Sequence, residues 1–207
     1  MLVLPASQPD SIERAVAILR DGQVIAFPTD TVYGVGAHGF IASAIERLYE
    51  LKGRERQKAI PLLIARIEDL TMVAVGIPAV TWKLAERFWP GPVTLVLPKA
   101  AKVLDVLTAG GNSVAVRIPG HDVTLQLIAA LGAPLAATSA NLSGQSEVVT
   151  AEETQAIFGT QLALILDGGR CPGGIPSTVV DVTKFPPRIL RRGALAEEVE
   201  AFLSQFS

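Results

Sequence analysis

Cysteine and histidine are scarce in this chain of 207 residues, which contains one cysteine, Cys171, and two histidines, His38 and His121. A single cysteine excludes an intramolecular disulfide and a cysteine-ligated metal cluster. Two histidines leave too few ligands for a histidine-rich zinc site. We therefore expect neither a metal centre of these kinds nor a disulfide-stapled scaffold.

Long apolar runs and a surplus of positive charge are also missing. No run approaches the ~20 residues that a membrane-spanning helix needs, and the first residues, MLVLPASQPD, lack the basic start of a secretory signal. We expect a cytoplasmic protein without a membrane partner. The formal net charge is −2, whereas proteins that bind nucleic acid over a broad surface are usually basic. Any binding of tRNA is therefore expected to be weak and confined to a local basic cleft.

Several common catalytic motifs do not occur either. The chain has no Walker A sequence, no Gly-x-Ser-x-Gly elbow and no His-Glu-x-x-His motif, which removes the common NTPase, hydrolase and zinc-protease interpretations. The segment GVGAHG at 34–39 matches the dinucleotide-binding pattern Gly-x-Gly-x-x-Gly. However, six residues separate Gly34 from the preceding strand, and Glu55, about twenty residues on, lies in a polar run. We expect these glycines to let the backbone turn sharply or approach a ligand.

Hydrophobic residues make up 49% of the chain, enough for the core of a single domain that spans 1–207. Their spacing predicts alternating helices and strands. The expected helices span 10–21, 41–51, 78–88, 123–131, 151–157 and 197–206. The expected strands span 23–27, 61–64, 93–97, 114–118, 134–137, 162–166, 178–182 and 188–190. This mixture indicates an α/β (α+β) fold with a large sheet, which is partly antiparallel because the last connections are too short for helices.

Polar segments rich in glycine and proline follow several expected strands, where binding sites are commonly built. The segment KGRERQK at 52–58 carries four cations and one acid, so four minus one gives a charge of +3. Lysine and arginine neutralise phosphoryl oxygens, and a polyanion such as a triphosphate fits this segment. The alternative is a solvated loop after a helix C-terminus, where cations suit the helix dipole.

Other segments offer hydroxyl, amide and guanidinium groups. TSANLSG places Ser139, Asn141 and Ser143 just after a strand, where they could contact a phosphate or ribose or form an ordinary turn. Arg117 ends the strand in VAVRIPGH and could hold a carboxylate through a bidentate bond or form a structural salt bridge. Arg191, in ILRRG, could serve an anionic ligand or keep an edge strand soluble.

The order of these segments is more specific than any one of them. From about the first expected helix to Gly193, the chain reads PTDTVYG, LKGRERQKAIPL, WPGPVT, VAVRIPGH, TSANLSG, PSTVVD and ILRRGAL. This order resembles the YrdC/Sua5 family of threonylcarbamoyl-AMP synthases, in its short, single-domain bacterial form. The resemblance implies a twisted sheet of mixed parallel and antiparallel strands, with surrounding helices and a large, concave, basic cleft.

The resemblance also implies an activity. Members of the family are L-threonylcarbamoyladenylate synthases, a class of nucleotidyltransferase. They convert L-threonine, bicarbonate or CO2, and ATP with Mg2+ into threonylcarbamoyl-AMP and pyrophosphate. Downstream threonylcarbamoyl-transfer proteins then modify the adenosine next to the tRNA anticodon.

The site residues implied by the resemblance come from matching its motifs position by position. The family's catalytic Lys, Arg, Ser and Asn correspond to Lys52, Arg54, Ser139 and Asn141. Nucleotide binding is assigned to Arg54, Lys58, Ser113, Ser139, Asn141 and Arg191. Threonine binding is assigned to Thr31, Tyr33, Arg117 and Ser177, and no residue is assigned to a metal.

The chain departs from the family pattern in three places. The segment PLLIAR lacks the histidine that many relatives carry in PLIVH, LRRG replaces LRPG, and QSEVVT stands where many relatives have RPSPT. The threonine contacts and the loop at 145–149 therefore stay open. Three other functions also stay open. The first is a carbamoyltransferase domain, which would need flanking domains. The others are a non-catalytic module that binds double-stranded RNA and a family paralogue with altered activity.

Overall fold

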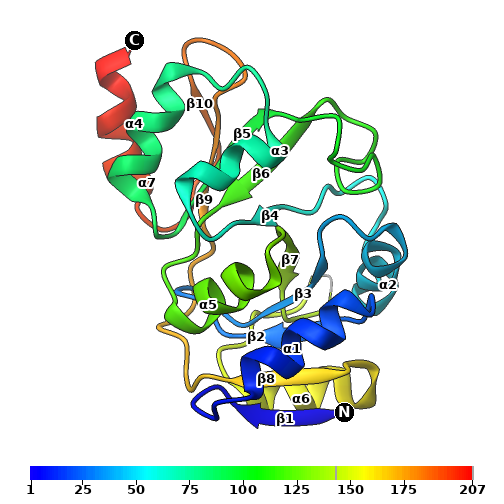
Figure 1. Cartoon of the computed structure of the whole chain (residues 1–207). Helices are drawn as coiled ribbons and strands as arrows, with labels where there is room; N and C mark the ends of the chain where they lie inside the picture. Colours follow the sequence, from blue (N-terminus) through cyan, green and yellow to red (C-terminus); the bar gives the residue numbers. More distant parts are fainter. Residues whose placement is uncertain (143, 207) are drawn as a thin grey trace.

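The computed structural model describes residues 1–142 and 144–206. Within this part of the chain, ten strands form one sheet in the order β1-β8-β2-β3-β7-β4-β6-β5-β9-β10 (Figure 1). The strands are β1 (Leu2–Pro5), β2 (Ile25–Phe27), β3 (Gly34–His38), β4 (Leu62–Leu63), β5 (Val93–Pro98), β6 (Ser113–Arg117), β7 (Leu135–Ser139), β8 (Leu164–Asp167), β9 (Thr178–Asp181) and β10 (Arg188–Arg191). The helices are α1 (Ser11–Arg20), α2 (Ala42–Lys52), α3 (Leu70–Val73), α4 (Ala79–Phe88), α5 (Asp122–Leu131), α6 (Ala151–Phe158) and α7 (Ala196–Leu203). Short 3-10 turns span Ile67–Asp69, Gly159–Gln161 and Ser204–Phe206.

The sheet mixes parallel and antiparallel neighbours, as expected. Strand β8 runs parallel to β1 and β2, β4 parallel to β6, and β5 parallel to β9. Strand β3 is antiparallel to β2 and β7, β4 to β7, β5 to β6, and β9 to β10. The predicted α/β class is therefore confirmed, and each expected helix and strand has a counterpart. Strands β1 and β3 and the short helix α3 were not expected.

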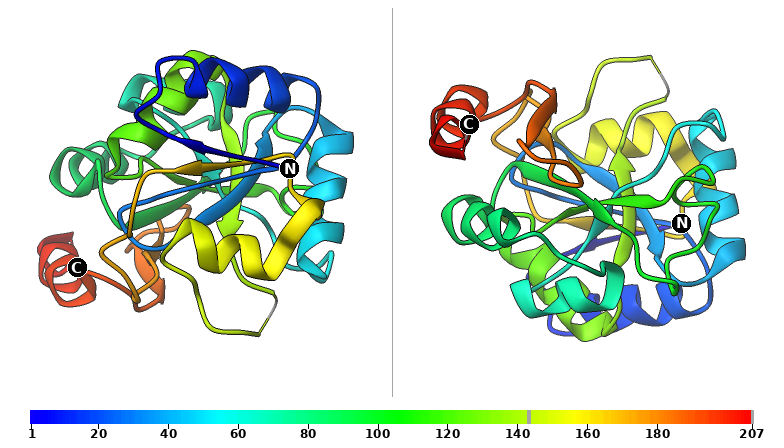
Figure 2. Two further views of the ribbon diagram at one scale, coloured as in Figure 1. Left: turned by 90° about the horizontal axis from the view of Figure 1, so that it is seen from below. Right: turned by 90° about the horizontal axis from the view of Figure 1, so that it is seen from above.

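Side-chain alternation along β2 shows how the sheet is buried on both faces. Ile25 and Phe27 belong to an apolar cluster that α1 and α5 complete, whereas Ala26 belongs to the larger cluster on the other face. Figure 2 shows α1 and α6 on opposite sides of the strands between them. Helices on both faces explain why the central strands are apolar without interruption. No helix among the described residues is long and apolar enough to cross a membrane.

The glycine-rich segment at 34–38 is strand β3, so the expectation of a sharp turn there was wrong. A Cβ atom on Gly36 would lie 2.8 Å from the carbonyl oxygen of Ala136 and 2.9 Å from the ring of Phe27. A Cβ atom on Gly39 would lie 2.7 Å from the carbonyl oxygen of Pro134. Gly36 is needed because β3 lies tightly between the backbone of β7 and the ring of Phe27, and Gly39 because it lies against Pro134 and Leu62.

We expect Gly36→Ala to lower the free energy of unfolding by about 1–3 kcal/mol, the usual cost of inserting a methyl group into a filled core. Urea denaturation would measure the change. Gly120→Ala is the control, because the added Cβ there would meet nothing closer than 3.4 Å. Equal stability of Gly36→Ala and the wild type would contradict this account of β3.

Candidate active site

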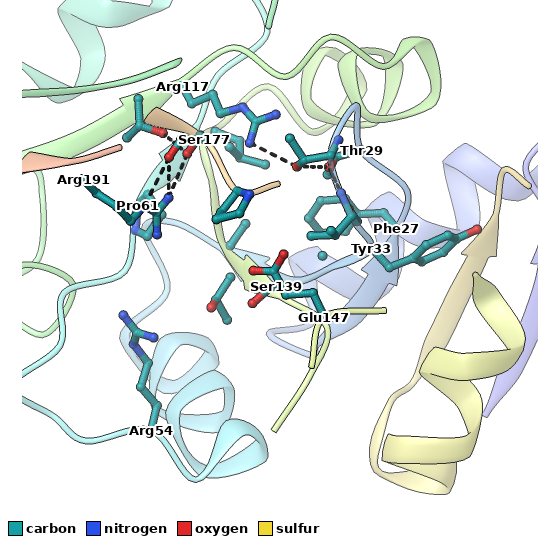
Figure 3. A pocket seen from close by; sticks show the side chains of 18 residues that line it. Phe27, Thr29, Tyr33, Arg54, Pro61, Arg117, Ser139, Glu147, Ser177 and Arg191 are labelled. Atoms are coloured by element: carbon teal, nitrogen blue, oxygen red, sulfur yellow. Dashed lines mark hydrogen bonds between the residues drawn. The ribbon is translucent and has the colours of Figure 1, made fainter. Parts of the chain in front are cut away.

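A cavity of about 210 Å³ lies on one face of the sheet, where distant segments of the chain meet (Figure 3). Strand register brings four of its residues into place: Leu63 of β4 pairs with Arg117 of β6, and Gly34 of β3 pairs with Ser139 of β7. The lining is formed by Phe27, Thr29, Thr31, Val32, Tyr33, Gly34, Arg54, Pro61, Leu63, Thr94, Arg117, Ala137, Thr138, Ser139, Glu147, Pro176, Ser177 and Arg191. Seven of the residues predicted for the site therefore share one cavity.

Positive charge is concentrated at this cavity. The charged residues of its lining are Arg54, Arg117, Arg191 and Glu147, so three minus one gives +2. The whole chain carries −2. Such a local reversal of sign favours an anionic ligand.

The loop between β2 and β3 is fixed by the hydroxyl group of Thr29. This hydroxyl donates to the carbonyl oxygen of Val32 (2.7 Å) and accepts from the N–H groups of Thr31 (3.1 Å) and Val32 (3.2 Å). It also lies 2.9 Å from the hydroxyl of Thr31. Side-chain bonds of this kind stabilise tight turns, and here they hold Thr31 in the cavity wall.

Tyr33 is part of the wall, but its hydroxyl points away from the cavity (Figure 3). The hydroxyl donates to the carbonyl oxygen of Gly169 (2.9 Å) and accepts from the N–H of Gly168 (3.2 Å). Burial raises the pKa of Tyr33, so the group stays a neutral donor. Its role in this structure is to anchor the wall rather than to present a polar group to a ligand.

Arg117 enters the cavity from the end of β6 and is held by a buried ion pair. Its Nη2 atom bonds to Oδ1 of Asp30, and only 9% of the Arg117 side chain and 13% of that of Asp30 is exposed. Its Nε donates to the carbonyl oxygen of Gly91 (3.0 Å), and Nη1 lies 3.5 Å from the hydroxyl of Thr31. Burial lowers the pKa of Arg117, and the Asp30 carboxylate opposes that shift. Arg117 therefore forms a structural salt bridge and also lines the cavity. The two alternatives drawn from the sequence do not exclude each other.

Ser177 and Arg191 form another part of the cavity lining, with Ser177 close to Arg117 (Figure 3). The hydroxyl of Ser177 lies 2.8 Å from that of Thr94. Nη2 of Arg191 donates to the carbonyl oxygen (2.8 Å) and the hydroxyl (3.1 Å) of Ser177. The segment before β9 and the end of β10 are therefore linked at the cavity.

Arg54 reaches the cavity because α2 ends at Lys52, two residues earlier. Gly53 follows the helix with φ of 55°, in the left-handed region that favours glycine. Arg54 then donates from Nε to the carbonyl oxygen of Lys58 (3.0 Å) and from Nη2 to that of Ala59 (2.8 Å). These bonds fold the basic segment back on itself and orient the guanidinium.

The other cations of the segment at 52–58 lie elsewhere. Lys58 is exposed and pairs with Glu55 at 2.8 Å. Arg56 pairs with Glu46 and lies over the ring of Tyr49, 5.0 Å from its centroid. Lys58 and Arg56 therefore belong to a solvated loop, the alternative drawn from the sequence. Lys58 is not among the described residues that line the cavity.

Lys52 is buried behind the cavity wall, with 3% of its surface exposed. Its Nζ donates to the carbonyl oxygens of Ser139 (2.5 Å) and Asn141 and to Oδ1 of Asn141 (3.1 Å). The hydroxyl of Ser139 also donates to Oδ1 of Asn141 (2.6 Å). Burial lowers the pKa of Lys52 to about 8, helped by Arg54 and opposed by Glu147. Lys52 therefore ties α2 to the segment after β7, and its charge acts on the cavity through the wall.

Four of the predicted site residues are absent from the cavity lining that the structure describes: Lys52, Asn141, Lys58 and Ser113. Ser113 begins β6 beside Pro98, four residues before Arg117. Ser143 lies outside the described residues.

The structure adds residues that the sequence interpretation missed. Asp30 holds Arg117, Thr94 contacts Ser177, and Glu147 brings a carboxylate into the cavity. Asp30 could have been found, because it is the one acid in PTDTVYG. Glu147 lies in QSEVVT, the segment already known to depart from the family pattern.

Known proteins resemble the chain over nearly its whole length. A family model named Sua5_yciO_yrdC, described as "Telomere recombination", matches residues 17–193. The threonylcarbamoyl-AMP synthase of Pyrococcus abyssi is 43% identical over 195 residues, which cover 94% of this chain and 57% of that protein. A putative threonylcarbamoyl-AMP synthase of Mycobacterium tuberculosis is 34% identical, over 94% of this chain and 89% of that protein.

Solved structures agree with the sequence comparison. The crystal structure of P. abyssi Sua5 complexed with L-threonine has a TM-score of 0.94 at 40% identity, and the match covers 99% of this chain and 61% of that one. The chain thus spans little more than half the length of its archaeal relative. The matched family model, the sequence relatives and the shared fold together show that the chain belongs to the Sua5/YciO/YrdC family.

Proposed function

We propose that the protein is a threonylcarbamoyl-AMP synthase, which makes threonylcarbamoyl-AMP and pyrophosphate from L-threonine, bicarbonate or CO2, and ATP. The observation that carries the proposal is the convergence of Arg54, Arg117 and Arg191, from three separate segments, on one cavity of an acidic chain. The names of the relatives and the threonine complex of the archaeal relative support it. The reaction would make the protein a nucleotidyltransferase.

The threonine subsite would lie around Arg117. A guanidinium is suited to a carboxylate because two N–H groups can bind both oxygens, and Asp30 fixes the orientation of this one. Thr31 and Ser177 place hydroxyl groups beside it. We assign these three residues to the amino acid, and Tyr33 to the wall behind it.

The nucleotide would occupy the part of the cavity near Arg54, Ser139 and Arg191. Two of these residues bring positive charge, and the hydroxyl of Ser139 is positioned by Asn141. Lys58 is exposed close to Arg54 and would reach a nucleotide only at the cavity rim. We keep Ser113 as a candidate at the periphery.

The chemistry requires charge neutralisation and alignment. The amine of threonine adds CO2 and loses a proton, which gives an N-carboxylate. An oxygen of this carbamate attacks the α-phosphorus of ATP; the new O–P bond forms while the bond to the β-phosphate oxygen breaks, and pyrophosphate leaves with the electron pair. Because both reactants are anions, fixed positive groups that hold them in line supply most of the rate enhancement. The carbamate needs no further deprotonation, so a side-chain base is dispensable in this step.

A divalent cation fits this scheme as a companion of the nucleotide. The described residues contain no group of three or more His, Cys, Asp or Glu side chains that could hold a metal by themselves. Mg2+ commonly binds through phosphates and one or two carboxylates, and it would neutralise phosphate charge. The product would then serve downstream threonylcarbamoyl-transfer proteins that modify tRNA.

The test is to incubate the protein with ATP and Mg2+, leaving out threonine or bicarbonate in turn, and to detect the adenylate by mass spectrometry. We expect threonylcarbamoyl-AMP only in the complete mixture, together with pyrophosphate. A complete mixture without the adenylate, from folded protein, would refute the proposal.

The lowered pKa of Lys52 predicts how nucleotide binding depends on pH. Its pKa of about 8 means that the ammonium form predominates below pH 8 and favours a polyanion, whereas the neutral amine predominates above it. We therefore expect the affinity for an ATP analogue to fall as the pH rises through about 8. Titration calorimetry across this pH range would measure the fall in affinity. In Lys52→Gln the side chain at position 52 is uncharged throughout the range, so this variant should not show the fall. Parallel profiles for the two proteins would contradict the role of Lys52.

A further inference from the structure

Glu147 brings negative charge into a cavity that otherwise favours anions. It lies in the segment between β7 and α6 and lines the cavity together with Arg54 and Ser139 (Figure 3). It is the one carboxylate among the lining residues that the structure describes. Facing a bound triphosphate, this carboxylate would repel it.

The carboxylate has an unused oxygen. Oε2 of Glu147 is buried and has no hydrogen-bond partner among the described residues. A buried polar atom without a partner is unfavourable by the full cost of its desolvation, so it calls for a ligand that is not part of the chain.

Ion pairing with neighbouring cations does not explain why the carboxylate of Glu147 lies at this cavity. No ion pair among the described residues includes it. The guanidinium of Arg54 donates to the carbonyl oxygens of Lys58 and Ala59, and the ammonium of Lys52 donates to three acceptors of the 139–141 segment. The charge of Glu147 opposes the lowering of the pKa of Lys52, but Glu147 is not among the hydrogen-bond acceptors of Lys52 in the described structure.

The backbone next to Glu147 is anchored, so the side chain is held at the cavity. The carbonyl oxygen of Val148 accepts from the N–H of Tyr33 (2.9 Å), and that of Val149 accepts from the N–H of Cys171 (2.8 Å). The N–H of Val149 donates to Oε2 of Glu153 (2.7 Å). These bonds to the residue before β3, to the segment after β8 and to α6 fix the place of the carboxylate.

We infer that Glu147 is a protein ligand of the divalent cation that accompanies the triphosphate, an inference that rests on the proposed function. Mg2+ prefers oxygen ligands and is typically shared between one or two carboxylates and substrate phosphates. A cation between Glu147 and the phosphates turns a repulsive contact into two attractive ones and satisfies the unused oxygen. The cavity is then built for a metal–nucleotide complex and discriminates against the metal-free nucleotide.

The test compares Glu147→Gln with the wild type in binding α,β-methylene-ATP, which cannot be cleaved at the reacting bond. Titration calorimetry is run once with Mg2+ and once with EDTA. We expect the wild type to bind the analogue more tightly with Mg2+ than with EDTA. The variant should bind more weakly than the wild type with Mg2+ but more tightly with EDTA, because the repulsion is gone. A merely structural role of Glu147 would weaken binding in both solutions and could not produce this crossing.

Two further proteins complete the design. Glu152→Gln removes the same charge from an exposed position in α6 and should keep the wild-type dependence on Mg2+. If Glu147→Gln does not fold, as judged by circular dichroism, Glu147→Ala replaces it. Paramagnetic resonance with Mn2+ and the analogue gives a second readout, in which the variant should show a weaker protein-bound Mn2+ signal than the wild type at equal concentrations.

The outcomes separate the two proposals. A wild type that binds the analogue in neither solution would overturn both the proposed function and the metal role. A wild type that binds the analogue, beside a variant with the same ratio of affinities with and without Mg2+, would overturn the metal role alone.

Discussion

Arg54→Ala should lower the rate of adenylate formation by about 10²–10³-fold, the usual effect of removing one well-aimed donor from charge that develops in a transition state. Arg54 is the single cation of the segment at 52–58 that lines the cavity within the described structure. Its guanidinium is oriented by two carbonyl oxygens, so it needs little reorganisation when the reaction begins. Pyrophosphate release with ATP, threonine and bicarbonate measures the loss.

Arg56→Ala is the matched control for Arg54→Ala. It removes the same side chain from the same segment, but Arg56 is engaged with Glu46 and Tyr49 at the surface. Its activity should stay within about twofold of the wild type, because exposed ion pairs contribute little. If both variants lose activity equally, the effect comes from the net charge or fold of the segment, and the assignment of Arg54 falls. Unchanged activity of Arg54→Ala would refute it directly.

Arg117→Met should destabilise the protein by about 3–5 kcal/mol and abolish threonine binding. Removing one partner of a buried ion pair leaves the other charge buried without compensation. Here that charge is Asp30, whose Oδ2 already has no hydrogen-bond partner among the described residues. Urea denaturation measures the stability, and calorimetric titration with L-threonine measures the binding.

A double variant separates the two effects. Asp30→Asn combined with Arg117→Met removes both charges, and we expect it to recover much of the lost stability because no unpaired ion remains. It should still fail to bind threonine, since no guanidinium is left for the carboxylate. Recovery of threonine binding in the double variant would show that Arg117 serves the fold alone.

Apolar periodicity was sufficient to predict the strands that carry a buried face. Strands such as β5 and β6 have runs of branched side chains, and their place in the chain was predicted to within a residue or two. Strand β3 could not be predicted in the same way, because Gly34 and Gly36 have low strand propensity. It is a strand because it pairs with β2 and β7. Gly34 and Gly36 fit there because Phe27 and the backbone of β7 leave no room for a side chain, and most of that constraint comes from residues far away in sequence.

The motifs pointed to seven residues that line one cavity, but they did not predict the different positions of the cations at 52–58. The basic segment at 52–58 looks uniform, yet Arg54 lines the cavity, Lys52 is buried and Lys58 is exposed. Burial of Lys52 depends on three acceptors that lie 87 to 89 residues away. A pattern of charges within one segment carries no information about such partners.

The pairing of β1 with β8 has a consequence for biosynthesis. Strand β8 separates β1 from β2, and it joins residues at the start of the chain to Leu164–Asp167. While the ribosome is still making the earlier part, β1 has no partner and β2 has one free edge. Ser177 and Arg191 emerge later still. A growing polypeptide therefore acquires its capacity to hold ligand only after Arg191 has been made, and until then its unpaired edges are what a chaperone would meet.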